Sequence, residues 1–206
     1  MSKAKDKSDN STIHADMPDG GGDISPVITG PGDRTVSVAR PIITGTCHPG
    51  RNVRVVSIGR EDALSPEQQP SNGNFRLTFQ QDLRPGLNTF EVLQWQRMQA
   101  SHRRSNDWHL YHLPAPVITS PVAGATVGRT PTITGNGGYP RAIIQVVKHG
   151  NPNVIYGQGT VNNEGIWSVP ITVALPVGAF SFTARQQLDG KNGILWAAFV
   201  PVTVTG

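Results

Sequence analysis

The chain has 206 residues and a net charge of +4, with 36% of its residues hydrophobic and only 16% charged. This length suits one large domain or two small ones, and so few charges argue against a bundle of amphipathic helices. The 23 glycines and 17 prolines stay below the proportion that marks a disordered chain, so we expect a folded protein with many turns.

Residues 1–25 carry three lysines and five aspartates, with almost no aromatic or β-branched residues. Burial in such a segment cannot offset the entropy cost of ordering, so a disordered polar tail is predicted. The tail lacks the apolar stretch of a signal peptide, and no segment has the roughly 20 apolar residues of a transmembrane helix. We therefore expect a cytoplasmic protein or one exported by a non-classical route.

An internal repeat begins at residue 26. Residues 26–29 recur at 116–119 and residues 41–45 recur at 131–135, both at an offset of 90. Further matches at offsets of 91 and 92 pair Val53, Phe75, Leu83, Gly86 and Phe90 with Ile144, Trp167, Leu175, Gly178 and Phe182. Trp108 is matched with Trp196 at an offset of 88. The pattern predicts two copies of one unit, at residues 26–113 and 114–206.

Each copy contains short β-branched or alternating runs separated by turn residues, as in residues 179–185 and 196–204. About seven strands in some 90 residues predict an antiparallel sandwich of the immunoglobulin type. The fold class is therefore all-β, with two tandem sandwiches. The alternating prolines of Leu113-Pro114-Ala115-Pro116 favour an extended linker, so the sandwiches are expected to lie end to end and nearly rigid.

Three motifs occur in both copies: Pro-x-Ile-Thr, Pro-x-Ile-Thr-Gly and Leu-x-x-Gly-x-x-x-Phe-x-x-x-Gln. The second copy also has Asn-x-x-Gly-x-Trp. Over residues 26–206 this order resembles bacterial Ig-like tandem repeats. The second copy matches well through Asn162 to Trp167 and Leu175 to Gln186, whereas the first has Phe75 for the tryptophan and a longer segment at residues 61–71. The resemblance implies a non-enzymatic spacer or binding module of surface and secreted proteins.

Cys47 is the single cysteine, so no intramolecular disulfide can form. His102, His109 and His112 lie close in sequence, but strand periodicity places His109 and His112 on opposite faces, so no metal site is predicted. The carboxylates beyond the tail lie mostly beside turn residues and form no acid and base pair. We expect no enzymatic activity and no cofactor.

Residues 94–108 are the polar stretch that most favours a binding site, because they form a predicted hairpin with aromatic and basic side chains. The candidate binding residues are Trp95, Arg97, His102, Arg103 and Arg104. Trp95 is the preferred exposed contact, because Gln187 stands at the matching position of the second copy. The other tryptophans, Trp108, Trp167 and Trp196, are expected to serve packing.

The leading hypothesis is a binding or spacer module with a protein partner, a component or cargo of a bacterial surface, secretion or phage-like assembly. An alternative is a toxin-associated or lectin-like protein that binds glycans through the hairpin. A third hypothesis, nucleic-acid binding, depends mainly on the isoelectric point of about 9.6. The expected partner is a protein or a glycan and not a nucleic acid. The sequence leaves the oligomeric state open.

Overall fold

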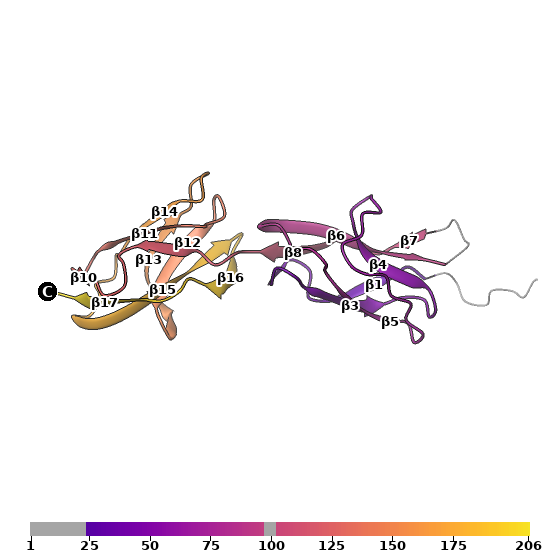
Figure 1. Cartoon of the computed structure of the whole chain (residues 1–206), viewed down its shortest axis with the longest axis horizontal. Helices are drawn as coiled ribbons and strands as arrows, with labels where there is room; N and C mark the ends of the chain where they lie inside the picture. Colours follow the sequence, from indigo (N-terminus) through magenta and orange to yellow (C-terminus); the bar gives the residue numbers. More distant parts are fainter. Residues whose placement is uncertain (1–23, 97–101) are drawn as a thin grey trace, which may run out of the picture.

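The computed structural model describes residues 24–96 and 102–206, which form two antiparallel β-sandwiches of the immunoglobulin type, end to end (Figure 1). This confirms the predicted fold class. Within these ranges there is no α-helix, and so none that could cross a bilayer. Most of the predicted disordered tail, residues 1–23, lies outside the described residues. The candidate residue Arg97 lies outside them as well.

The N-terminal sandwich consists of eight strands. They are β1 (Val27–Gly30), β2 (Thr35–Ser37), β3 (Ile42–Thr46), β4 (Asn52–Ser57), β5 (Asn74–Thr78), β6 (Gly86–Trp95), β7 (His102–Arg104) and β8 (Trp108–His112). One sheet has the order β1-β3-β5 and the other β2-β8-β6-β4, with β7 paired to β6. Residues 61–71 lie along the outer edge of β4, where Gln68 bonds to Val53 and Ala63 forms a bridge with Val56.

The C-terminal sandwich repeats this arrangement. Its strands are β9 (Val117–Ser120), β10 (Thr126–Val127), β11 (Thr132–Asn136), β12 (Ile143–Lys148), β13 (Asn151–Thr160), β14 (Trp167–Pro170), β15 (Gly178–Leu188), β16 (Lys191–Trp196) and β17 (Val200–Val204). The sheets have the orders β14-β11-β9 and β10-β17-β15-β12-β13, with β16 paired to β15. A regular strand, β13, thus takes the place that residues 61–71 take in the N-terminal sandwich.

One pair in each sandwich is parallel, β2 with β8 and β10 with β17, although only antiparallel pairing was expected. β2 has three residues and β10 has two, and the chain reaches each of them after a turn from the opposite sheet. A short strand that switches sheets in this way lies along the last strand in the same direction.

Each sandwich has its own hydrophobic core. Alternate residues of the facing strands fill it, because successive side chains of a strand point to opposite sides. Trp167 is the largest side chain of the C-terminal core, and Phe75 holds the equivalent place in the N-terminal core. Cys47 is free and buried in the N-terminal core, where burial raises the pKa of its thiol.

Candidate functional site

The predicted binding residues lie at the end of β6 and on β7. Trp95 is directly opposite His102, and Arg104 is opposite Leu93. Directly opposed residues of an antiparallel pair share a face, so Trp95, His102 and Arg104 all lie on the outer face of the sheet. Arg103 is opposite the buried Gln94 and therefore points to the other face. The structure thus brings three of the predicted residues together and separates Arg103 from them.

Trp95 is half-buried, and the guanidinium of Arg54 lies over its ring, 5.1 Å from the ring centroid. Asn52, on the same strand as Arg54 and directly opposite Trp95, is 2% exposed. Among the described residues, Asn52 Nδ2 and Arg54 Nε are buried and have no hydrogen-bond partner. Because these two atoms have almost no exposed surface, a ligand could accept their hydrogen bonds only if a neighbouring side chain moved.

Arg104 is already engaged within the protein. Its guanidinium forms an ion pair with the buried carboxylate of Glu91, which also accepts a 2.9 Å hydrogen bond from the backbone N–H of Gly59. Removing one partner of such a pair leaves a buried charge uncompensated, so the pair fixes Arg104 in place. Next to it, His102 Nδ1 lies 3.6 Å from Glu61 Oε1. The basic residues of this face are therefore largely matched by carboxylates.

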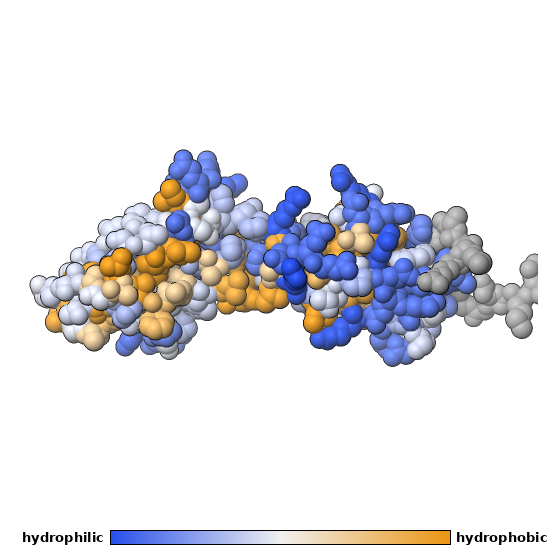
Figure 2. All heavy atoms as spheres, in the orientation of Figure 1, coloured by the Kyte–Doolittle hydropathy of each residue, from blue (hydrophilic) through white to orange (hydrophobic). Residues whose placement is uncertain are grey.

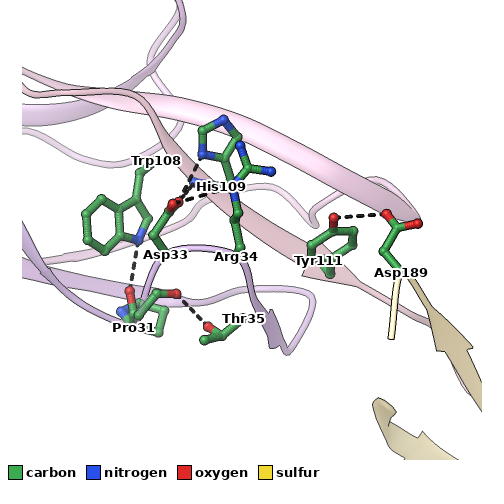
Figure 3. A network of polar contacts seen from close by, with 9 residues as sticks. Pro31, Asp33, Arg34, Thr35, Trp108, His109, Tyr111 and Asp189 are labelled. Carbon is green, nitrogen blue, oxygen red and sulfur yellow. Dashed lines mark hydrogen bonds and ion pairs between the residues drawn. The ribbon is translucent and has the colours of Figure 1, made fainter. Parts of the chain in front are cut away.

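The remaining histidines have separate partners. The backbone N–H of His109 donates a 2.8 Å hydrogen bond to Asp33 Oδ1, and the His109 ring nitrogen Nδ1 lies 2.9 Å from the same oxygen (Figure 3). His112 is buried, with Nδ1 3.4 Å from the carbonyl oxygen of Ser37. Among the described residues no group of three or more His, Cys, Asp or Glu side chains could hold a metal ion.

Asp33 links this histidine to the stability of the N-terminal sandwich. Burial raises the pKa of Asp33, but the hydrogen bonds and charge of His109, together with Arg34, outweigh burial and lower the pKa below its ordinary value. A carboxyl whose pKa is lower in the folded state stabilises the fold above the pKa of the unfolded chain. The stabilisation is lost as the pH falls through the folded-state value.

We expect Asp33→Asn to lower the free energy of unfolding near pH 7 by about 0.5 kcal/mol, a small value because the carboxyl is partly exposed and screened by solvent. The difference from the parent protein should shrink as the pH falls below the ordinary aspartate pKa, and it should vanish once the carboxyl is protonated in the folded state as well. Urea unfolding at a series of pH values from 7 downward measures it, with the exposed Asp107→Asn as control. An equal loss at every pH would contradict the assignment.

The two sandwiches meet at a joint formed by side chains of both. The hydroxyl of Tyr111, in the N-terminal sandwich, donates a 3.0 Å hydrogen bond to Asp189 Oδ2 of the C-terminal sandwich (Figure 3). This bond, followed by burial, raises the pKa of Tyr111. The Tyr139 ring covers Gly86, where a Cβ atom would lie 2.5 Å from the ring. A cavity of about 360 Å³ remains between these contacts.

The third element of the joint is a buried glutamine. Gln186 accepts a 2.6 Å hydrogen bond from the N–H of Tyr139 and donates one of 2.6 Å to the carbonyl of Pro114 in the linker. Gln94 does the same in the N-terminal sandwich, where it bonds to the N–H of His48 and the carbonyl of Ile24. The glutamine of the repeated motif thus ties the entering chain to each sandwich.

The sequence predicted an extended linker but not the side chains of the joint, although two signals for them were present. The repeated Gln-containing motif marks Gln94 and Gln186, and Asp189-Gly190 marks the hairpin turn that reaches Tyr111. The proposed equivalence of Trp108 and Trp196 is wrong. Strand pairing places Trp108 opposite Phe90 but Trp196 opposite Arg185, so Trp196 corresponds to Arg104. The strand register keeps the offset of 92 up to this point, because Leu93 faces Arg104 and Arg185 faces Trp196. The misalignment arose because the two tryptophans were matched by residue type, at an offset of 88.

No protein-family model matches the chain, and no curated protein matches it. Among solved structures, the chain is similar to the BSP domain of a biofilm-associated protein, with 17% identity and a TM-score of 0.34 over 86% of this chain and 30% of that one. A titin fragment has 12% identity and a TM-score of 0.38 over 88% and 96% of the two chains. The human OSCAR ligand-binding domain has 11% identity and a TM-score of 0.36 over 86% and 97%.

Proposed function

We propose that the chain is a non-enzymatic module that presents a protein-binding face at a fixed distance and orientation. It would comprise two units, residues 26–113 and 114–206. The observation that carries the proposal is the joint, because three separate contacts restrain it: Tyr111 with Asp189, Tyr139 over Gly86, and Gln186 with Pro114. Domains without such contacts move relative to each other by default. The setting in a bacterial surface, secretion or phage-like assembly is part of the proposal and depends on the sequence resemblance.

Residual dipolar couplings test the fixed orientation, since a rigid pair of sandwiches shares one alignment tensor. We expect equal tensor magnitudes in the parent protein. In the double variant Tyr139→Ala with Asp189→Asn, the magnitudes should differ by about twofold, because two of the three restraints are gone. Asn163→Ala, in an exposed turn of the C-terminal sandwich, serves as control. Unequal tensors in the parent would refute the fixed joint.

A glycan ligand is the second candidate, favoured by the half-buried Trp95 ring on the outer face of the sheet. A glycan array with the parent protein and with Trp95→Ala decides between the two. If the parent protein binds a glycan and Trp95→Ala does not, the glycan hypothesis is supported. If the parent protein binds no glycan, the hypothesis is rejected. Nucleic-acid binding would instead weaken steeply with salt.

A further inference from the structure

The outer face of the C-terminal sandwich contains an open groove of about 420 Å³, distinct from the joint and from the face that carries Trp95, His102 and Arg104. It lies between the β12–β13 turn and the segment that connects β16 to β17. Trp196, Phe199, His149 and Val147 are among its lining residues. Apolar surface gathers on this sandwich, whereas the same view of the N-terminal sandwich is largely hydrophilic (Figure 2).

In the N-terminal sandwich, side chains fill the position that corresponds to this groove. By strand register, Glu91 corresponds to Thr183 and Arg104 to Trp196, and Gly59 corresponds to Gly150. The ion pair of Glu91 and Arg104 occupies the position that is left as a groove between Thr183 and Trp196. The groove is therefore a specific difference between two otherwise equivalent faces.

The aromatic rings of the groove are held before any ligand arrives. The His149 and Phe199 rings stack with centroids 4.5 Å apart and an angle of 25° between them, and Phe199 is still 54% exposed. The guanidinium of Arg185 lies 5.0 Å from the centroid of the Trp196 ring. Rings that are fixed in this way lose little freedom on binding, so an apolar group can dock at low entropic cost.

The polar groups at the base of the groove are already paired. The Thr183 hydroxyl donates a 2.7 Å hydrogen bond to the carbonyl of Ala197, and the N–H of Ala197 donates one of 2.8 Å to Ala184. An apolar side chain is therefore favoured there over a sugar, which would need several polar partners. Ala198 and Phe199 lie between β16 and β17, outside the strands, so their backbone can meet a peptide main chain.

The charge around the groove is positive. Lys148 lines it and Arg185 flanks it, and no carboxylate is among its lining residues. In residues 114–206 the only acids are Glu164 and Asp189, and Asp189 is bonded to Tyr111. We propose that the groove binds an acidic segment of a partner protein, with an aromatic or branched aliphatic side chain placed against Trp196 and Phe199.

Three peptides test this proposal in an NMR titration of the full chain: acetyl-Glu-Phe-Glu-amide, acetyl-Lys-Phe-Lys-amide and acetyl-Glu-Ser-Glu-amide. The first should give saturable shifts of the Lys148, His149, Ala198 and Phe199 amides. The second should bind about tenfold more weakly, because its charges oppose Lys148 and Arg185. The third, without an aromatic ring, should give no saturable shift. Equal affinity for the first two peptides, or stronger shifts with cellobiose, would overturn the proposal.

Two variants locate the site. Phe199→Ala should weaken the first peptide at least about tenfold, while Val177→Ala, another exposed apolar residue, should leave it unchanged. The double variant Thr183→Glu with Trp196→Arg places the ion pair of the N-terminal sandwich into the groove and should abolish binding. If the double variant does not fold, the test depends on Phe199→Ala, whose fold is checked by the dispersion of its amide resonances. Retained binding in Phe199→Ala would overturn the proposal.

Discussion

Gly135→Ala is expected to destabilise the C-terminal sandwich by about 3 kcal/mol, because an added methyl group finds no space. A Cβ at this position would lie 2.1 Å from the carbonyl oxygen of Val117 and 2.1 Å from the Trp167 ring. One of these atoms belongs to the backbone of β9 and the other to the largest side chain of the core, so neither can move without loss of packing. Urea unfolding, followed through the amide resonances of each sandwich, measures the effect.

Gly128→Ala is the control for this variant, since a Cβ there has no atom within 4 Å and the backbone needs no positive φ. Gly45→Ala is the counterpart in the N-terminal sandwich, where the Cβ would lie 2.1 Å from the Val27 carbonyl and 2.3 Å from Phe75. Each variant should weaken its own sandwich far more than the other. A single shared transition, equally lowered by both, would contradict the two separate cores.

Gln186→Ala should lower the free energy of unfolding of the C-terminal sandwich by about 2–3 kcal/mol, since the N–H of Tyr139 and the carbonyl of Pro114 both lose their partner. The side chain is fully buried, so water replaces it poorly. The same change releases the linker from the sandwich. We therefore also expect faster backbone motion at Ala115, measured by ¹⁵N relaxation.

Two variants complete this comparison. Gln94→Ala should cost the N-terminal sandwich a similar amount through His48 and Ile24, without any change at Ala115. Gln158→Ala, an exposed glutamine of β13, should be neutral. Unchanged relaxation at Ala115 in Gln186→Ala would mean that the glutamine does not hold the linker.

Periodicity and the repeat predicted much of the fold, because they record which residues face a core. Phe75 and Trp167 were matched at an offset of 92, and both stand opposite a glycine that their ring covers, Gly45 and Gly135. Strand alternation predicted that His109 and His112 lie on opposite faces of one strand, and in the structure each has its own partner. Such features depend on local pattern and on a core that both sandwiches share.

The sequence marks single residues of the joint, such as Gln186, but it does not show which residues meet there or on the two outer faces. The contact of Tyr139 with Gly86 depends on how two complete sandwiches meet, and neither residue looks unusual within its own strand or turn. Arg104 resembled a free basic residue because its partner, Glu91, is 13 positions earlier on another strand. Trp196 was assigned to packing, although it lines the groove, because it was matched with Trp108 by residue type and not by strand register.

The parallel pairing of β2 with β8 has a mechanical consequence. Thr35, Val36 and Ser37 lie beside Leu110, Tyr111 and His112 in the same direction. Tension applied to the chain before β2 and after β8 pulls these strands past each other along their length, so it strains their hydrogen bonds together in shear and not one after another. The pairing of β10 with β17 has the same geometry. A force along the long axis of the molecule (Figure 1) therefore loads one pair of parallel strands in shear in each sandwich.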